Sequence, residues 1–189
     1  MTNQKPRVDR RGFLQASAAA GLATIASGVS GSVQAQASPD PGVLDQPAGT
    51  PLRMRRVVTG HRADGQSFVA IDEVLNNESS AREGMQASVI WSTGESPADN
   101  MDTQDGAART LATSDDNGTV FRIVKYDPGV APRNHRTQSV YYAVIMSGEI
   151  TMGLDEGEVT LRQGDVLVQR GTIHNWVNNG SVPCLVAFI

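Results

Sequence analysis

The sequence of 189 residues predicts an all-β domain that closes into a sandwich or barrel. About ten short segments rich in β-branched and aromatic residues follow one another from residue 54 onward. Glycine, asparagine, aspartate or proline separates them, as is typical of hairpin turns. No stretch has the apolar periodicity of a long helix. These three observations together favour a β-sandwich or a β-barrel.

The expected strands follow in order along residues 54–189, and several alternate between apolar and polar side chains. Residues 93–117 interrupt them with a long polar stretch, which we expect to be either a lid over a site or a disordered loop, with one helical turn near "GAARTLA". The expected strands are "MRRVVTG" (54–60), "SFVAID" (67–72), "ASVIWS" (87–92), "TVFRIVKY" (119–126), "VYYAVIMS" (140–147), "EITMGLD" (149–155), "EVTLRQ" (158–163), "DVLVQ" (165–169), "HNWVN" (174–178) and "CLVAFI" (184–189).

Residues 1–37 have the pattern of an export signal rather than of a folded domain. Arg10 and Arg11 precede "GFL", a weakly apolar Ala/Gly-rich stretch follows, and "AQA" at 35–37 offers a small-residue cleavage site. The pattern resembles a twin-arginine (Tat) signal, with an ordinary Sec signal as the alternative. The stretch is too short and too rich in small residues for a lasting membrane span. We therefore expect a periplasmic or secreted protein with no span after signal removal.

The remaining chain predicts a short linker and one domain. Residues 38–51 hold four prolines and two glycines and are expected to be flexible, whereas 52–189 form the domain. Residues 38–189 retain 12 of the 16 Lys and Arg and 19 of the 20 Asp and Glu, a formal net charge of −7. An acidic domain without basic clusters argues against nucleic-acid partners. Cys184, the single cysteine, is interpreted as a buried small hydrophobe.

Two motifs within residues 129–189 resemble those of the cupin family, which are small double-stranded β-helix barrels of the jelly-roll type. In the first motif, Gly129, His135 and Gly148 fall on the family's spacing. Thr137 replaces the family's second histidine, and Tyr141 replaces its glutamate. The resemblance implies a cupin barrel over residues 52–189, with its motif core at 129–189.

The second motif lies in "GDVLVQRGTIHNWVN". It supplies Gly171, His174 and Asn178 at the family's spacing, with Gln169 in the position of a proline. Both motifs are most similar to a subgroup of small-molecule cupins that reads "HRT…DYxxVxSGE" and "GDVVVQRGTxHxWxN". That subgroup shares the threonine and glutamine replacements, but it has aspartate where this chain has Tyr141.

The candidate site gathers residues from both motifs. Alternation along a strand puts His135 and Thr137 on one face, which the resemblance places inside the barrel, where His135 should meet His174 near the mouth. Neutral imidazoles are effective proton carriers near neutral pH. The candidate catalytic residues are His135, His174 and Tyr141, and the candidate substrate-binding residues are Thr137, Gln169, Trp176 and Met146.

Metal binding by His135 and His174 stays open. A catalytic metal usually needs about three protein ligands, and the third histidine of the chain, His61, lies outside the motif frame. Two imidazoles, completed by water, by the Gln169 oxygen or by a Tyr141 phenolate, would hold a divalent transition metal only weakly. The expected cofactor is therefore either none or such a weakly held metal.

Three functions remain open from the sequence. The resemblance implies a lyase, isomerase or dehydratase-type enzyme acting on a small organic substrate, and the alternatives are a metal-dependent dioxygenase-like cupin and a non-catalytic periplasmic ligand-binding cupin. Arg136 and Arg170 either anchor a substrate carboxylate or pair with acidic loops, and Trp176 is either a pocket wall or core. Family members often pair through an N-terminal strand, so a homodimer is expected.

Overall fold

A computed structural model covers the chain and describes residues 44–189. The predicted export signal, residues 1–37, and residues 38–43 of the predicted linker lie outside the described residues. The described part belongs to one compact unit, Ala37–Ile189. Within residues 44–189, no helix combines the length and the apolar character that a membrane crossing needs.

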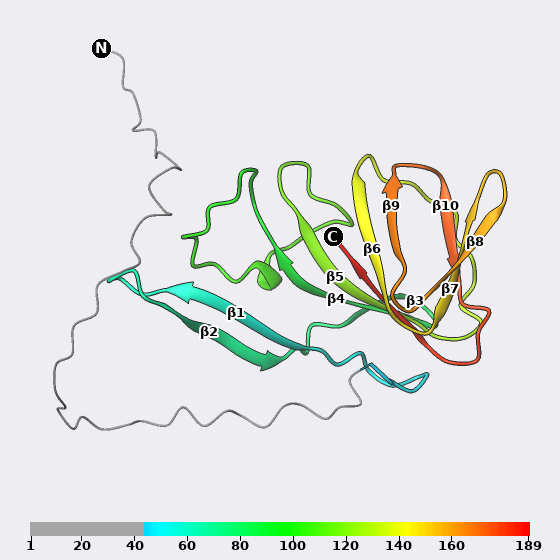
Figure 1. The fold of residues 1–189 in the computed structure, drawn as a ribbon, viewed down its shortest axis with the longest axis horizontal. Coiled ribbons are helices and arrows are strands. Elements are labelled where there is room, and N and C mark those ends of the chain that lie inside the picture. Colours follow the sequence, from blue (N-terminus) through cyan, green and yellow to red (C-terminus); the bar gives the residue numbers. More distant parts are fainter. Residues whose placement is uncertain (1–43) are drawn as a thin grey trace, which may run out of the picture. The chain divides into compact units, whose positions relative to one another are not determined.

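The predicted all-β fold is confirmed (Figure 1). Strands make up the regular structure of the described residues, apart from one turn of 3-10 helix, η2 (Gly106–Ala108). The strands are β1 (Arg55–His61), β2 (Ser67–Val74), β3 (Ser79–Arg82), β4 (Met85–Ser92), β5 (Val120–Tyr126), β6 (Val140–Ser147), β7 (Glu149–Leu154), β8 (Glu158–Arg162), β9 (Val166–Arg170), β10 (His174–Val177) and β11 (Cys184–Phe188).

The strands form a hairpin and two larger sheets. β1 and β2 pair with each other, the larger sheet has the order β3-β4-β5-β11-β6-β9, and the smaller sheet has the order β10-β7-β8. Neighbouring strands pair in the antiparallel sense throughout. Because β6 and β9 belong to one sheet while β7, β8 and β10 belong to the other, the chain passes repeatedly between the sheets and encloses a core (Figure 1).

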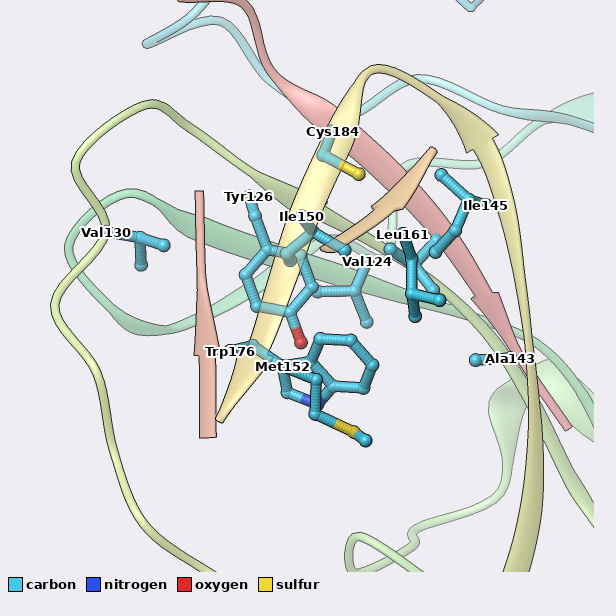
Figure 2. Packing of buried hydrophobic residues seen from close by; sticks show 11 residues of the cluster. Val124, Tyr126, Val130, Ala143, Ile145, Ile150, Met152, Leu161, Trp176 and Cys184 are labelled. Atoms are coloured by element: carbon cyan, nitrogen blue, oxygen red, sulfur yellow. The ribbon is translucent and has the colours of Figure 1, made fainter. Parts of the chain in front are cut away.

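The barrel interior is packed with apolar side chains. Tyr126, Met152 and Trp176 lie close together at its centre (Figure 2). Cys184 is a fully buried free thiol, as the sequence predicts, and burial raises its pKa to about 12. At roughly 2 kcal/mol for each fully buried large apolar side chain, this core is a main source of stability. The remaining buried members of the cluster are Val124, Val130, Ala143, Ile145, Ile150, Leu161 and Val186.

A second apolar cluster covers the opposite face of the larger sheet. Leu52, which precedes β1, packs there against Ile123 and Leu185. Met146 belongs to this cluster and not to the interior, so its predicted place in a pocket wall is wrong. The reason is the two-residue alternation of β6, which turns Tyr141 inward and Met146 outward.

The end of the expected linker belongs to the folded domain. Lys125 is fully buried, and its Nζ donates hydrogen bonds to the carbonyl oxygens of Pro47, at 3.0 Å, and of Thr50. Asp127 lies 3.6 Å from the same ammonium. A buried charge is tolerated only when hydrogen bonds and an opposite charge compensate it. Lys125 therefore holds this segment of the chain against the sheet.

The polar stretch 93–117 is anchored at its middle. Ser92 Oγ donates to the carbonyl oxygen of Gly106 at 2.6 Å. A Cβ atom at Gly106 would lie 2.5 Å from the Ser92 carbonyl oxygen and 2.7 Å from the Trp91 ring, so only glycine fits this approach. Asp105 accepts bonds of 2.7 and 2.8 Å from Arg56, which is 4% exposed and also binds Glu73. These contacts tie the stretch to β1 and β4.

Candidate functional site

The structure brings the two candidate histidines together as backbone neighbours. His174 is the first residue of β10, and His135 forms an isolated antiparallel bridge with it. The His135 amide donates to the His174 carbonyl at 2.9 Å, and the reverse bond measures 3.0 Å. Their ring centroids lie 4.4 Å apart. His174 is 1% exposed, whereas His135 is only half-buried, so His135 is the imidazole nearer to solvent.

Backbone carbonyls fix the same tautomer on both rings. His135 Nδ1 lies 3.0 Å from the carbonyl oxygen of Arg133, and His174 Nδ1 lies 2.9 Å from that of Thr172. A carbonyl oxygen can only accept, so the proton is assigned to each Nδ1. Gln169 Nε2 also lies 3.1 Å from His174 Nδ1, but its two protons are taken by the carbonyl and hydroxyl oxygens of Thr172. Each Nε2 therefore has a free lone pair when the ring is neutral.

Tyr141 completes the group from β6. Its hydroxyl lies 2.8 Å from His174 Nε2, and because that nitrogen is the acceptor, the tyrosine donates. Burial raises the pKa of Tyr141, although a hydrogen bond from Trp176 acts in the opposite direction. Burial likewise lowers the pKa of His174, a change that the Thr172 backbone bond opposes. Both shifts favour the uncharged forms, so the pair is a neutral phenol bonded to a neutral imidazole near pH 7.

Gln169 supports the turn before His174 and is not free to contact a substrate. Its Oε1 accepts from the Gly171 amide at 2.6 Å. Its Nε2 lies 2.8 Å from the Thr172 carbonyl oxygen and 2.7 Å from the Thr172 hydroxyl. With its oxygen and both amide protons engaged, Gln169 can offer neither a metal ligand nor an oxyanion donor without breaking these bonds. Its predicted binding role thus becomes one of positioning His174.

Trp176 also supports the site from the core. The side chain is 2% exposed, and its ring meets those of His174 and Phe188 edge-on at centroid distances of 5.9 and 5.7 Å. Figure 2 shows it beside Tyr126 in the packed interior. Such edge-to-face contacts stabilise an aromatic cluster by roughly 1 kcal/mol each. Of the two readings that the sequence left open for Trp176, the structure favours core packing.

The remaining motif residues have structural partners. Thr137 is half-buried, and its hydroxyl accepts from Ser139 Oγ at 3.0 Å. Asn178 is fully buried and bonds backbone groups of Tyr126, Val182 and Gly180. Sequence reasoning assigned no role to Thr172, although the subgroup pattern "QRGTxH" contained it. Its carbonyl oxygen bonds His174 Nδ1 and its hydroxyl accepts from Gln169 Nε2, and only the tertiary structure shows these contacts.

The donor set does not fit a tightly held metal. Among residues 44–189 no group of three or more His, Cys, Asp or Glu lies together in a metal-binding arrangement. His61 ends β1 and is exposed, and it forms no metal-binding group with the motif histidines among the described residues. His135 and His174 supply two imidazoles, and Tyr141 would have to lose both its proton and its bond to His174 to become a third ligand. Catalytic metals usually have three protein ligands.

Comparison with known proteins decides the family. Residues 122–189 match the family described as "Cupin domain". A "Cupin-domain-containing oxidoreductase fogC" of Aspergillus ruber (strain CBS 135680) is 31% identical over 156 residues, which cover 78% of this chain and 77% of the relative. The chain belongs to the cupin family. The predicted jelly-roll barrel is thereby confirmed as a cupin barrel.

Other cupins and cluster proteins share parts of the sequence. The "Cupin-domain-containing oxidoreductase virC" of Hypocrea virens (strain Gv29-8 / FGSC 10586) is 34% identical over 139 residues, 69% of this chain and 72% of its own. The "Phomopsin biosynthesis cluster protein C'" of Diaporthe leptostromiformis is 52% identical over 62 residues, 32% of this chain and 33% of the relative. The solved structure of KdgF from Halomonas sp. aligns at 15% identity with a TM-score of 0.43, over 60% of this chain and 85% of that one.

Proposed function

We propose that this cupin is an enzyme that transfers protons on a small organic substrate, in a lyase, isomerase or dehydratase-type reaction. The observation that carries the proposal is the 2.8 Å bond from the Tyr141 hydroxyl to His174 Nε2, beside a half-buried His135. Hydroxyl and imidazole groups held in this way are typical of general acid–base sites.

We propose a role for each of the three residues. His135 Nε2 has no hydrogen-bond partner within residues 44–189, so it is the base that takes a proton from a substrate carbon. Before the substrate binds, His174 holds the Tyr141 hydroxyl in place by accepting its proton at Nε2. In the reaction the Tyr141 hydroxyl, kept protonated by its raised pKa, turns that single proton from His174 Nε2 to the substrate oxygen on which negative charge develops. Protonated His135 then returns its proton to another substrate atom, which completes an isomerisation or an elimination.

An oxidoreductase is the second candidate. It is supported by the names of the relatives fogC and virC, both cupin-domain-containing oxidoreductases. A dioxygenase-like form would need a transition metal on His135 and His174. The absence of a third His, Cys, Asp or Glu beside them within residues 44–189 counts against tight binding of that metal.

Deuterium exchange tests the proton-transfer proposal without knowledge of the natural substrate. The protein is incubated in heavy water with a panel of small ketones and β-keto acids, and NMR measures incorporation of solvent deuterium beside the carbonyl. We expect His135→Gln to slow exchange by about 10²–10⁴-fold, and His61→Gln, the exposed control, to leave it unchanged. Saturable binding without exchange would instead indicate a ligand carrier. One equivalent of metal with metal-dependent oxygen uptake would indicate the oxidoreductase.

We also infer a homodimer. On the outer face of β6 and β9, Tyr142, Val166 and Val168 are each more than half exposed. Tyr142 pairs directly with Val168, so these side chains form one apolar strip. Exposed apolar strips of this kind are typical of protein–protein contacts. We further propose Tat-dependent export on the basis of residues 1–37, and fusion of these residues to a reporter would test it.

A further inference from the structure

A cavity of about 370 Å³ opens at the rim of the barrel, where the chain enters β6 and leaves β9. Arg136, Arg170 and Thr137 contribute to its wall, together with exposed Val140. No carboxylate side chain lines it. Its volume is at the lower end of the range for small-molecule sites, and none of the roles described above uses its two arginines. The full lining is Arg136, Thr137, Gln138, Ser139, Val140, Arg170 and Gly171.

The guanidinium groups of Arg136 and Arg170 have no acidic partner among the described residues. Neither Arg136 nor Arg170 takes part in any of the ion pairs or side-chain hydrogen bonds found within residues 44–189. The sequence left open whether they pair with acidic loops, and in the described part of the chain they do not. Two free positive charges on one cavity are notable in a protein with a formal net charge of −4. They produce a local positive potential that attracts anions.

A hydroxyl donor completes the polar wall. Ser139 Oγ donates to Thr137 Oγ1 at 3.0 Å, so the Thr137 proton remains free to donate to a ligand. Gly171 closes the cavity with a φ of +69°, and a Cβ atom there would lie 3.1 Å from the Thr137 carbonyl oxygen. The wall is thus tight on the side of Gly171. It is also fixed, because the Gly171 amide is bonded to Gln169.

We propose that this cavity binds the carboxylate of a small organic acid. The proposal does not depend on the proposed function. A guanidinium matches a carboxylate with two parallel hydrogen bonds. Thr137 supplies a third donor, and Val140 gives an apolar surface for the carbon skeleton.

The cavity and the acid–base residues share their backbone. Arg136 directly follows His135 in the chain. On the other wall, Gly171 is bonded to Gln169, whose amide contacts the carbonyl oxygen that fixes His174. His135, His174 and Tyr141 are not among the residues that line the cavity, so an acid bound there lies beside the acid–base group and not within it.

Benzoate and its neutral counterpart benzamide provide a binding test that needs no turnover. NMR titration of the whole domain follows the backbone amides of Thr137, Ser139 and Gly171 up to roughly 20 mM probe, because a single anchored charge gives about millimolar affinity. We expect benzoate to shift these amides and to bind at least about 10-fold more weakly to R136Q and to R170Q. Arg53→Gln, an exposed arginine outside the cavity, is the matched control and should bind like the wild type.

Three results would overturn the proposal: equal binding of benzamide, no shift at these amides with benzoate, or tighter binding of inorganic phosphate than of benzoate. The acid–base residues separate this proposal from the proposed function. Tyr141→Phe should bind benzoate with unchanged affinity. If the wild type binds benzoate but shows no exchange activity, the proposed enzyme is refuted and the carboxylate site stands. Loss of binding in R136Q and R170Q with an unchanged circular dichroism spectrum excludes unfolding as the cause.

Discussion

Tyr141→Phe should remove the hydrogen bond between residue 141 and His174 while leaving the barrel intact. The substitution removes only the hydroxyl that donates to His174 Nε2 at 2.8 Å. The ring remains, and with it the edge contact to Phe188 at a centroid distance of 5.5 Å. The change therefore isolates one hydrogen bond from the surrounding packing.

The structure sets the size of the effect. The lost hydrogen bond itself stabilises the fold by about 1 kcal/mol. His174 is 1% exposed, so water does not readily replace the donor, and the unpaired Nε2 adds about another 1 kcal/mol. The free energy of unfolding should fall by about 2 kcal/mol, which lowers Tm by roughly 6 °C in a domain of this size. The pKa of His174 should rise, because its neutral form loses a bond.

Thermal unfolding by calorimetry and NMR titration of the imidazole measure these two changes. Tyr142→Phe is a matched control, since it makes the same substitution one residue along β6 on the outer face, where Tyr142 is 53% exposed. That control should change stability by less than about 0.5 kcal/mol. In the exchange assay, Tyr141→Phe should lose about 10²-fold or more, and the control should keep full activity.

Equal Tm values for the two phenylalanine variants, together with an unchanged pKa of His174, would refute the tyrosine–histidine bond. An intact bond with full exchange activity in Tyr141→Phe would leave the geometry standing but would remove Tyr141 from the mechanism.

Three further predictions follow from the same contacts. Burial lowers the pKa of His174 in the folded state, so the unfolded chain binds a proton more readily. The contribution of His174 to the free energy of unfolding should therefore be fully present above about pH 6.5, the pKa of histidine in the unfolded chain. It should be lost as the pH drops toward the folded pKa, and urea titrations should show a smaller loss in His174→Gln. Arg56→Gln should lower the free energy of unfolding by about 2 kcal/mol, because it breaks charge-assisted bonds at a buried guanidinium; Arg55→Gln, at an exposed pair, should have a smaller effect in the same urea titration. Val168→Lys should convert a dimer to a monomer in sedimentation velocity, whereas Val159→Lys, on the smaller sheet, should not.

The sequence predicts most of the strand pattern, because β-strands alternate their side chains and the turns between them need glycine or polar residues. The motif spacing also identifies His135 and His174 as partners. The misplacement of Met146 did not arise from missing information. Tyr141 and Met146 are five residues apart in one strand, and an odd separation puts them on opposite faces.

Contacts between distant segments are what only the tertiary structure decides. The sequence cannot show that the Gln169 side chain forms hydrogen bonds with Gly171 and Thr172 in its own turn. Nor can it show that the carbonyl of Thr172 fixes the proton of His174. Nor can it show that Arg136 and Arg170 line one cavity without a counter-charge. The strand pattern follows from side-chain type and spacing along the chain, but a hydrogen bond depends on which groups the fold places within about 3 Å of each other. For this reason the sequence determined the barrel, whereas only the tertiary structure decided which groups of the candidate site are hydrogen-bonded to one another.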